Sequence, residues 1–538
     1  MAGAPDRPAV VDDRSAAEVV ADPVSPPRGG QKAGKGRKRQ AGFPSPLAIL
    51  LLVMVGVWLL ALVIPSGLYE LDDSGAPIAG TYHVVDSPLD FGGRVRDLLL
   101  APVNGLYGIL DPASGQVGPF NSGWMFGSVQ VFLFILAIGG FMTVVFKTGS
   151  LDLGISRLAH RFASRGPALI VVLAVLFGFL GSVMSWSDES LGFYALLVPL
   201  LLALGYDRMT AVAVITVAPF VGAIGSTVTP FRIGVGSDAA GVSIADGLGL
   251  RLLLFVASMA LLIVYLLRYA KRVKQNPELA LVPHDPEDDE LVAAGASDDL
   301  PRLTGRDKAV IGLLAFTFAL LVFSIVPWGS ILNNTAIDPV THESVNSPFA
   351  WELGWWLPEL SAMFMVMAIV VALVARLGEA ETARTFLKGM ADFSGPAALV
   401  MVARGVAVIL NNTKTIDTIL NSMEGVVHGR SSVGFILLLA LVSLPLGFLV
   451  GSGSAGMALV MPVLAPLGDF AGVDRSMIVT AYNSMGAWLN LMLPTNAILM
   501  AGIALGRVGF DKYLKFMAPL LGMLLGLVLI VLVIGTFL

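Results

Sequence analysis

Polar side chains gather at four places inside long apolar segments, namely Ser185–Ser190, Ser226–Thr229, Gly451–Ser454 and Asn490–Asn496. Polar groups at membrane depth are costly, so they are rare there unless they serve a function. Hydroxyl oxygens, amide oxygens and freed carbonyls suit an alkali cation, and exposed N–H groups at helix N-termini suit a carboxylate. The residue types therefore predict a substrate and ion site with these members: Ser185, Ser187, Asp188, Glu189, Ser190, Ser226, Thr227, Thr229, Ser452, Ser454, Asn483, Asn490, Thr495 and Asn496.

Two of these places also carry signals that break a helix. Pro230 lacks a backbone N–H and clashes with the preceding turn, and several glycines between Gly222 and Gly241 lower the cost of leaving helical geometry. Pro494 takes the corresponding place in the second half of the chain. In hydrocarbon, an interrupted helix must lie against protein or a water-filled cavity. Paired interruptions indicate a secondary transporter, and the alternative is that Ser, Thr and Gly only permit close helix packing.

Charged residues near these places raise further hypotheses. Asp188 and Glu189 lie at the first polar tip, whose counterpart in the second half has only Gly and Ser. Such carboxylates could carry a proton, hold a cation or recognise a substrate ammonium, unless the tip simply reaches water. Arg232 could meet a substrate carboxylate or pair with Asp238. Arg404, within an apolar run, needs an acid or a group of carbonyls, and its role stays open between structure and substrate binding.

The composition is that of a membrane protein. Of the 538 residues, 56% are hydrophobic and 14% are charged, and mean hydropathy is +0.80, whereas soluble domains carry roughly 25% charged residues. The sequence has no cysteine, which excludes disulfides and metal–thiolate sites, and none of its five histidines has a metal-binding spacing. We therefore expect no metal or cofactor. The sequence also lacks a nucleophile–base pair and a phosphate loop, so an enzyme is not expected.

Charge and hydropathy divide the chain into four parts. Residues 1–42 are a predicted disordered cytoplasmic tail, 43–274 and 307–538 are two transmembrane repeats, and 275–306 are an acidic cytoplasmic linker. Lys and Arg near the span ends place the N-terminus inside and the C-terminus outside, with about nine crossings and two re-entrant hairpins. The predicted segments are Pro46–Ile64, Val95–Leu110 (interfacial), Phe132–Phe146, Thr148–Arg165 (amphipathic), Ala168–Leu204 (hairpin), Met209–Ala240 (broken), Leu250–Leu267, Leu357–Ala375, Ala397–Leu410, Val433–Leu467 (hairpin), Met477–Gly506 (broken) and Phe516–Phe537.

The second half of the chain repeats the first. TGSLDLGISRLAHRFASR at Thr148–Arg165 aligns without gaps on TKTIDTILNSMEGVVHGR at Thr413–Arg430, at an offset of 265 residues. Pro230 matches Pro494 at an offset of 264, which favours duplication over chance alignment. Because the second half gains a crossing before its hairpin, the two hairpins enter from opposite sides. The predicted fold class is an all-α polytopic membrane protein with two inverted repeats, each with a re-entrant helical hairpin and a broken helix.

Seven longer strings in the chain carry a resemblance: ESLGFYALLVPLLLALGYDR (Glu189–Arg208), GSTVTPF (Gly225–Phe231), SDAAG (Ser237–Gly241), ARGVAVILNN (Ala403–Asn412), IDTIL (Ile416–Leu420), GSGSAGMALVMPVLAPLGD (Gly451–Asp469) and VTAYNSMGAWLNLMLPTNA (Val479–Ala497). Together they resemble a known family, the YfcC-like branch of the anaerobic four-carbon dicarboxylate carriers (DcuC type). The resemblance covers about residues 45–270 and 306–538. It implies the elevator-type fold of the ion transporter superfamily, in which hairpin tips and broken helices hold substrate and cation, and a dimer through scaffold helices.

These observations predict a secondary active transporter, a symporter or antiporter, in the cytoplasmic (inner) membrane. The expected substrate is a small carboxylate-bearing metabolite such as a dicarboxylate, another organic acid or an amino acid, moved with Na+ or H+ as the coupling ion. A basic amino acid antiporter is the alternative within this class. A passive channel is the alternative of another class, but it would need a continuous polar stripe through several helices. Membrane lipid and a second copy of the chain are expected partners, and nucleic acid is not.

Overall fold

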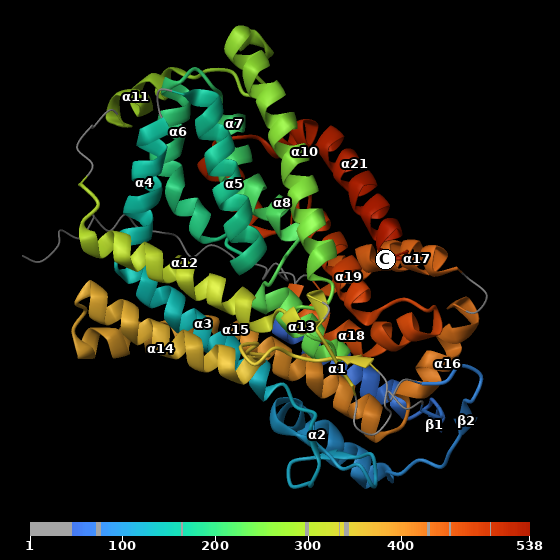
Figure 1. Cartoon of the computed structure of the whole chain (residues 1–538). Coiled ribbons are helices and arrows are strands. Elements are labelled where there is room, and N and C mark those ends of the chain that lie inside the picture. Colours follow the sequence, from blue (N-terminus) through green and yellow to red (C-terminus); the bar gives the residue numbers. More distant parts are fainter. Residues whose placement is uncertain are drawn as a thin grey trace, which may run out of the picture. The chain divides into compact units, whose positions relative to one another are not determined.

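The computed structural model describes most of the chain after Ser45 (Figure 1). The predicted tail, residues 1–42, lies outside the described residues, as do Ser452 and Thr495 of the predicted site. The described residues are 46–71, 77–162, 165–295, 301–332, 334–337, 344–427, 431–450, 453–494 and 496–537.

Most of the described chain is helical, and its longest helices are apolar. Such helices suit a bilayer because each satisfies its own backbone hydrogen bonds. Eight of the described helices are long and apolar enough to cross a membrane, namely α3 (Val129–Lys147), α5 (Gly166–Met184), α10 (Leu248–Gln275), α12 (Gly305–Ile325), α14 (Leu357–Ala375), α15 (Glu379–Asn412), α18 (Gly453–Phe470) and α21 (Phe510–Gly535). The first predicted span forms the shorter apolar helix α1 (Pro46–Ala61).

One set of helices is arranged around α15. This helix packs against α1, α2 (Phe91–Tyr107) and α3, while α14 packs against α3 and α12 (Figure 1). Gly105 of α2 meets Gly405 of α15 so closely that a Cβ on either residue would collide with the backbone of the other helix. Small residues thus permit the tight helix contacts that membrane proteins use.

A second set contains the predicted hairpins and broken helices. α8 packs against α5, α10 and α19, and α19 packs against α17 and α18. The first hairpin is α5 and α6 (Tyr194–Ala203), with a 3₁₀ turn at Glu189–Phe193, and the second is α17 (Ser432–Val450) and α18. The first broken helix consists of α7 (Arg208–Val212), a π-helical turn (Ala213–Val217), α8 (Ala218–Ile224), a second π-helical turn (Pro230–Gly234) and α9 (Val235–Ala240), and the second consists of α19 (Arg475–Asn490) and α20 (Ala497–Leu505).

The structure corrects the predicted extent of several helices. The predicted crossing Ala397–Leu410 is the last part of α15, which continues through Pro396. Packing of α15 along its length against three other helices outweighs the cost of an internal proline. The helix predicted at Leu250–Leu267 continues to Gln275, and α21 begins earlier than predicted, at Phe510.

The connecting segments also hold more regular structure than predicted. The acidic linker contains a helix, α11 (Pro286–Gly295), whose first turn carries three acids that favour a helix N-terminus. The predicted amphipathic segment forms α4 (Ser150–Phe162), and α16 (Ile416–Val427) is its counterpart in the second half. Short antiparallel strands pair in the loops, which an all-helical prediction omitted: β1 (Gly67–Leu68) with β2 (His83–Val84), β3 (Ile109–Leu110) with β4 (Val117–Gly118) and β5 (Trp124–Met125), and β6 (Thr335–Ile337) with β7 (Ser344–Asn346).

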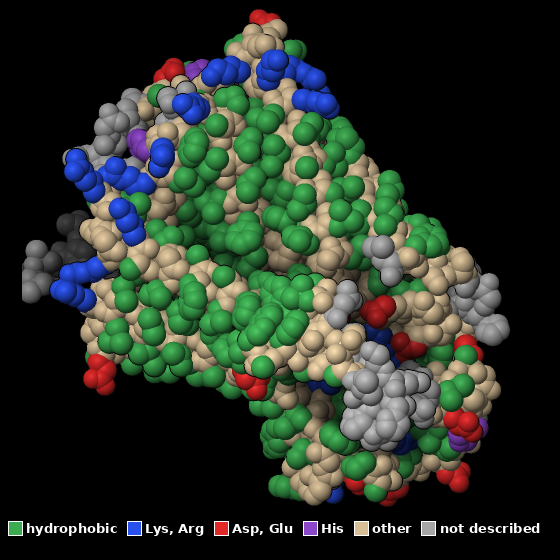
Figure 2. Space-filling view, viewed as in Figure 1, with side chains coloured by type: hydrophobic (Ala, Val, Ile, Leu, Met, Phe, Trp, Pro, Cys, Tyr) green, Lys and Arg blue, Asp and Glu red, His purple; other side chains and the backbone are tan. Residues whose placement is uncertain are grey.

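Charge is distributed unevenly over the surface. Lys and Arg side chains gather along the upper and left edges of the view in Figure 2, whereas hydrophobic side chains cover much of the face between them and the lower edge. The last turn of α10, a helix that reaches the upper edge of the view in Figure 1, contains Arg272 and Lys274. A basic edge beside an apolar surface is the pattern expected where membrane helices leave the bilayer.

Candidate functional site

The first hairpin and the first break are held together by hydrogen bonds. The Ser182 carbonyl, near the end of α5, accepts from the Thr227 amide at 3.0 Å and from Thr229 Oγ1 at 3.1 Å. The carbonyls of a last helical turn lack partners within the helix, so the break supplies them. Gly181 and Gly222 make this approach possible, because a Cβ on either would collide with the backbone opposite. Thr227 and Thr229, both predicted site residues, therefore join the break to the hairpin.

Arg251 of α10 closes the other side of the first break. Its side chain is only 1% exposed. Nε donates to the Thr227 carbonyl at 3.1 Å, Nη1 donates to the Asp246 carbonyl at 2.8 Å, and Nη2 donates to the Ile244 carbonyl. One guanidinium thus satisfies three carbonyls that no helix satisfies. Arg251 was not among the residues predicted from the sequence, although a single charge followed by the apolar run LLLFVASMALLIVY is a visible signal.

The two broken helices meet at the end of α8. Asn483 Nδ2 donates to the Ala223 carbonyl at 3.2 Å and to the Ile224 carbonyl at 3.4 Å, and Ser484 Oγ donates to the Ile224 carbonyl at 2.8 Å. Ser226 Oγ also donates to Ala223, at 2.8 Å. Asn483 and Ser226, predicted from sequence, therefore lie at one place, and Ser484 is an additional member.

A small cavity lies between the first break, the second hairpin and α19. Its volume is about 20 Å³, enough for about one water molecule. Asn483 Oδ1 is buried there without a hydrogen-bond partner among the described residues, and the side chain of Tyr482 is 5% exposed. The residues that line the cavity are Arg232, Gly447, Gly453, Met457, Tyr482, Asn483, Gly486 and Asn490.

The described lining of this cavity is positively charged. Arg232 is partly exposed, and within the described part of the chain it forms neither an ion pair nor a hydrogen bond. Its guanidinium lies against the first residue of α18, since a Cβ on Gly453 would be 2.9 Å from Arg232 Cζ. A helix N-terminus carries a partial positive charge. Two positive groups therefore meet at a cavity whose described lining includes no acidic residue.

The alternative pairing of Arg232 with Asp238 is not present. Asp238 has its electrostatic partner in Arg404 of α15. Arg404 Nε donates to the Phe126 carbonyl at 2.8 Å, and the guanidinium lies 4.7 Å from the centre of the Phe126 ring. Arg404 thus has a carbonyl, an aromatic face and a nearby acid as partners. Arg232 has no comparable group of partners among the described residues.

The first tip lies apart from the cavity lining. Ser185 ends α5 in a left-handed conformation (φ 55°), and Trp186 packs edge-on against Phe177 and Phe193. Ser190 Oγ donates to the Ser187 carbonyl at 2.7 Å, so these two serines stabilise the turn itself.

The two acids of this tip are accessible. Asp188 is exposed and Glu189 is partly exposed, and neither forms an ion pair with a described residue. The tip therefore presents two carboxylates at a place distinct from the cavity that Arg232 faces, and their role stays a prediction.

The second break is closed mainly by its own residues. Asn496 Oδ1 accepts from the amides of Ile498 and Leu499 at 3.1 and 3.3 Å, and Asn496 Nδ2 donates to the Asn490 carbonyl at 3.1 Å. Tyr513 of α21 donates to the Leu491 carbonyl at 2.8 Å. Asn496 thus serves as an N-cap of α20. Of the predicted residues of the second half, Asn483 and Asn490 line the cavity, whereas Ser454 lies buried near the start of α18.

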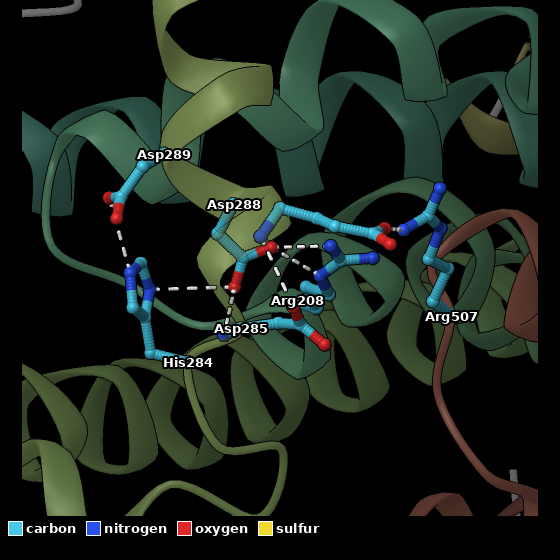
Figure 3. A network of polar contacts seen from close by, with 7 residues as sticks. Arg208, His284, Asp285, Asp288, Asp289 and Arg507 are labelled. Carbon is cyan, nitrogen blue, oxygen red and sulfur yellow. Dashed lines mark hydrogen bonds and ion pairs between the residues drawn. The ribbon is translucent and has the colours of Figure 1, made fainter.

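The linker helix α11 connects the ends of the two broken helices (Figure 3). Asp288, which is 1% exposed, accepts from Arg208 Nε at 2.6 Å at the start of α7. Glu287 forms an ion pair with Arg507, which follows α20. His284 Nδ1 lies 3.4 Å from Asp288 Oδ2, and His284 Nε2 lies 3.2 Å from Asp289 Oδ1. The acidic linker is thus attached to both halves of the chain.

A buried carboxylate accompanies this network. Asp207 caps α7 by accepting from the Thr210 amide at 2.9 Å. Burial raises the pKa of the Asp207 carboxyl above its ordinary value, while hydrogen bonds from Tyr269 and Thr210 oppose this shift. The start of the first broken helix is therefore held by a local N-cap, Asp207, and also by contacts with α10 and α11, which are distant in the sequence.

The fold is similar to that of solved membrane transporters. The YdaH transporter of Alcanivorax borkumensis matches with a TM-score of 0.62 at 18% identity, over 91% of this chain and 98% of that chain. MtrF of Neisseria gonorrhoeae, described with a class of antimetabolite efflux pumps, matches with a TM-score of 0.58 at 18% identity, over 93% and 96%. With eight candidate spans among its described helices, the chain has the fold of a multi-pass membrane protein.

Sequence comparison defines the family. The profile of the C4-dicarboxylate anaerobic carriers (DcuC) matches residues 43–537, so the chain belongs to this family. Escherichia coli YfcC, whose name assigns it provisionally to basic amino acid antiport, is 30% identical over 508 residues, which cover 90% of this chain and 95% of YfcC. An uncharacterized Haemophilus influenzae protein is 27% identical over 515 residues, covering 91% and 96%. These relatives confirm the resemblance predicted from the sequence strings.

Proposed function

We propose that the chain is a secondary active transporter that carries a small carboxylate-bearing metabolite across the cytoplasmic membrane. The observation that carries this proposal is the Arg232 guanidinium, which faces a cavity and has no anionic partner among the described residues. A hydrogen bond to a charged group contributes about 1.5–3 kcal/mol. A substrate carboxylate would supply such a contact to Arg232, which is partly exposed and lines the cavity.

The other polar groups of the cavity fit the same ligand. The α18 N-terminus adds partial positive charge, and helix N-termini bind carboxylates through free N–H groups. Tyr482 can donate a hydrogen bond from its hydroxyl, and Asn483 Oδ1 can accept one from a substrate hydroxyl or ammonium. A carboxylate with an adjoining polar group would therefore provide hydrogen-bond partners for the Arg232 guanidinium, the Tyr482 hydroxyl and Asn483 Oδ1.

Alternating access is part of the proposal. With room for about one water, the cavity is closed to a metabolite in this conformation, so the start of α18 must separate from Arg232 before substrate enters. An elevator movement of the hairpins and broken helices, arranged as two inverted repeats, would then carry the site across the membrane. The similarity in fold to solved transporters supports this mechanism.

Uptake into proteoliposomes tests the role of Arg232. Arg232→Gln should raise KM for the transported carboxylate about 10- to 100-fold, because a hydrogen bond to a charged group contributes roughly 1.5–3 kcal/mol. Arg232→Lys, which keeps the charge but not the planar fork, should recover part of the loss. Arg384→Gln, at an exposed position of α15, is the matched control and should transport normally. An unaltered KM in a folded Arg232→Gln protein, for every carboxylate that the wild type transports, would reject the proposal.

Basic amino acid antiport is the second candidate, and the name of YfcC favours it. Arg232 would then hold the α-carboxylate, and an acid would have to hold the cationic side chain. Asp188 and Glu189 are accessible acids at the first tip. In arginine counterflow, Glu189→Gln should abolish exchange if Glu189 recognises the substrate cation. If Glu189 instead carries the coupling proton, the same change should abolish proton-driven accumulation and spare counterflow. If Glu189→Gln retains full counterflow and full accumulation driven by a Na+ or H+ gradient, Glu189 neither binds the substrate cation nor carries the coupling proton.

Orientation and assembly complete the proposal. We place the N-terminus in the cytoplasm and the C-terminus outside, and we expect a homodimer. A cysteine at Thr335 should react with an impermeant reagent from outside, and a cysteine at Glu278, on the linker side, should not. Both positions are exposed in the structure, so lack of reaction at position 335 would contradict this orientation. Cross-linking in membranes would test the dimer.

A further inference from the structure

An apolar hollow lies between α4 and α5. Its volume is about 380 Å³, and its lining consists of Leu158 from α4 with Val171, Val172, Val175, Leu176 and Phe179 from α5. Val175 is 45% exposed and Phe179 is 48% exposed, so the hollow is open at the protein surface. Figure 2 shows hydrophobic side chains around a hollow on the face where α4, α5 and α12 are visible.

The depth of the hollow matches one leaflet of a bilayer. α5 begins at Gly166, and the lining residues of α5 follow 5 to 13 positions later. At a rise of 1.5 Å per residue, they lie roughly 8–20 Å from the helix start. Half of a hydrocarbon core of about 30 Å is about 15 Å. If the start of α5 lies at the membrane surface, the hollow therefore lies at the depth of acyl chains.

Basic residues mark the start of α5. Arg157 and Arg161 are four positions apart on α4, on one helix face, and Arg165 directly precedes α5. Arg161 and Arg165 are exposed, whereas Arg157 Nε donates to the Pro301 carbonyl at 2.8 Å. The sequence has no acidic residue between Asp152 and Asp188. Positive charge at the surface end of an apolar hollow is complementary to a lipid with an anionic headgroup.

We propose that this hollow binds an anionic phospholipid, with an acyl chain against α5 and the headgroup phosphate at Arg161 and Arg165. A free phosphate would leave the apolar lining unoccupied, and a zwitterionic lipid would gain less from the two arginines. α4 follows α3 and also packs against α12, so the lipid would lie where the hairpin helix α5 adjoins the set of helices around α15.

Native mass spectrometry of the full chain with added phosphatidylglycerol or phosphatidylcholine tests the headgroup contact. The wild type should prefer phosphatidylglycerol about 30-fold, the preference expected from two basic contacts of about 1 kcal/mol each. In Arg161→Gln/Arg165→Gln this preference should vanish. Arg384→Gln/Lys388→Gln removes two basic residues from α15 and should keep the preference. Equal binding of the two lipids by the wild type, or an unchanged preference in the first double variant, would overturn the proposal.

A second variant tests the hollow itself. Val175→Trp fills the space between α4 and α5 and should weaken the binding of both lipids. The substitution removes the acyl-chain contact and leaves the arginines in place. If Val175→Trp instead changes the oligomeric state and leaves lipid binding unaltered, the hollow is a contact between copies of the chain, and the lipid proposal is wrong. If this variant fails to fold, the arginine variants still decide the question.

Discussion

The two broken helices differ in where their closing groups come from. At the first break, Ser182 of α5, Arg251 of α10 and Ser484 of α19 satisfy backbone groups from other helices. At the second break, Asn496 caps the resumed helix and reaches back to the Asn490 carbonyl, and among the described residues Tyr513 is the donor that comes from another helix.

This difference explains why the two breaks present different chemistry. At the offset of 264 that aligns Pro230 with Pro494 in the predicted repeat, Arg232 corresponds to Asn496. The Asn496 side chain is used to close its own break, so it has little capacity left for a substrate. The first break is closed by other helices, which leaves Arg232 facing the cavity. When other helices satisfy the backbone groups of a break, a side chain of the break itself can therefore remain available for binding.

Loss of Arg251 should have the largest effect on stability. Arg251→Met leaves the Thr227, Ile244 and Asp246 carbonyls without their donor, and we expect a loss of about 3–5 kcal/mol. Thermal unfolding in detergent, followed by fluorescence-detected gel filtration, measures it. Arg268→Met, at an exposed position of the same helix, is the control. If Arg251→Met and Arg268→Met have the same melting temperature, the hydrogen bonds from Arg251 do not stabilise the first break.

Loss of Tyr513 tests the donor that α21 contributes to the second break. Tyr513→Phe removes the hydrogen bond to the Leu491 carbonyl and should cost about 1–3 kcal/mol, the penalty of an unsatisfied buried acceptor. The same melting assay applies, with Tyr107→Phe at an exposed position as the control. A loss as large as that of Arg251→Met would remove the difference between the two breaks.

Loss of Asn496 should have the smallest effect of the three. Asn496→Ala removes an N-cap, which costs about 1 kcal/mol, and Asn496→Ser should restore most of it because serine caps equally well. Substrate affinity should remain near wild type in both variants. A large rise in KM with normal melting would show that Asn496 contacts substrate, and the assignment of binding to the first break would then be incomplete.

The breaks and hairpins could be predicted from the sequence because their causes are local. Pro230, Pro494 and the flanking glycines disturb a helix wherever they stand, and apolar length marks the membrane segments. The structure confirms the interruptions near the predicted residues. Helix ends were less predictable: α15 continues through Pro396 because its packing against other helices outweighs the local signal.

The candidate site could be predicted only in part. Asn483 and Asn490 were expected and do line the cavity, and Thr227 and Thr229 were expected and join the break to the hairpin. Tyr482, Ser484 and Arg251 were missed, because the carbonyls and the cavity that give them a role are formed by segments far away in the sequence.

The attachment of α11 has a mechanical consequence. Asp288 and Glu287 bind α11 to residues beside both broken helices, and ten Cα steps separate its last residue, Gly295, from the first residue of α12, Gly305. A chain of ten steps spans at most about 35 Å. While α11 stays attached, this tether limits how far Gly295 can travel from Gly305 to little more than the thickness of the hydrocarbon core, about 30 Å. For the proposed elevator movement, the linker would therefore set an upper bound on the distance that the broken helices travel relative to α12.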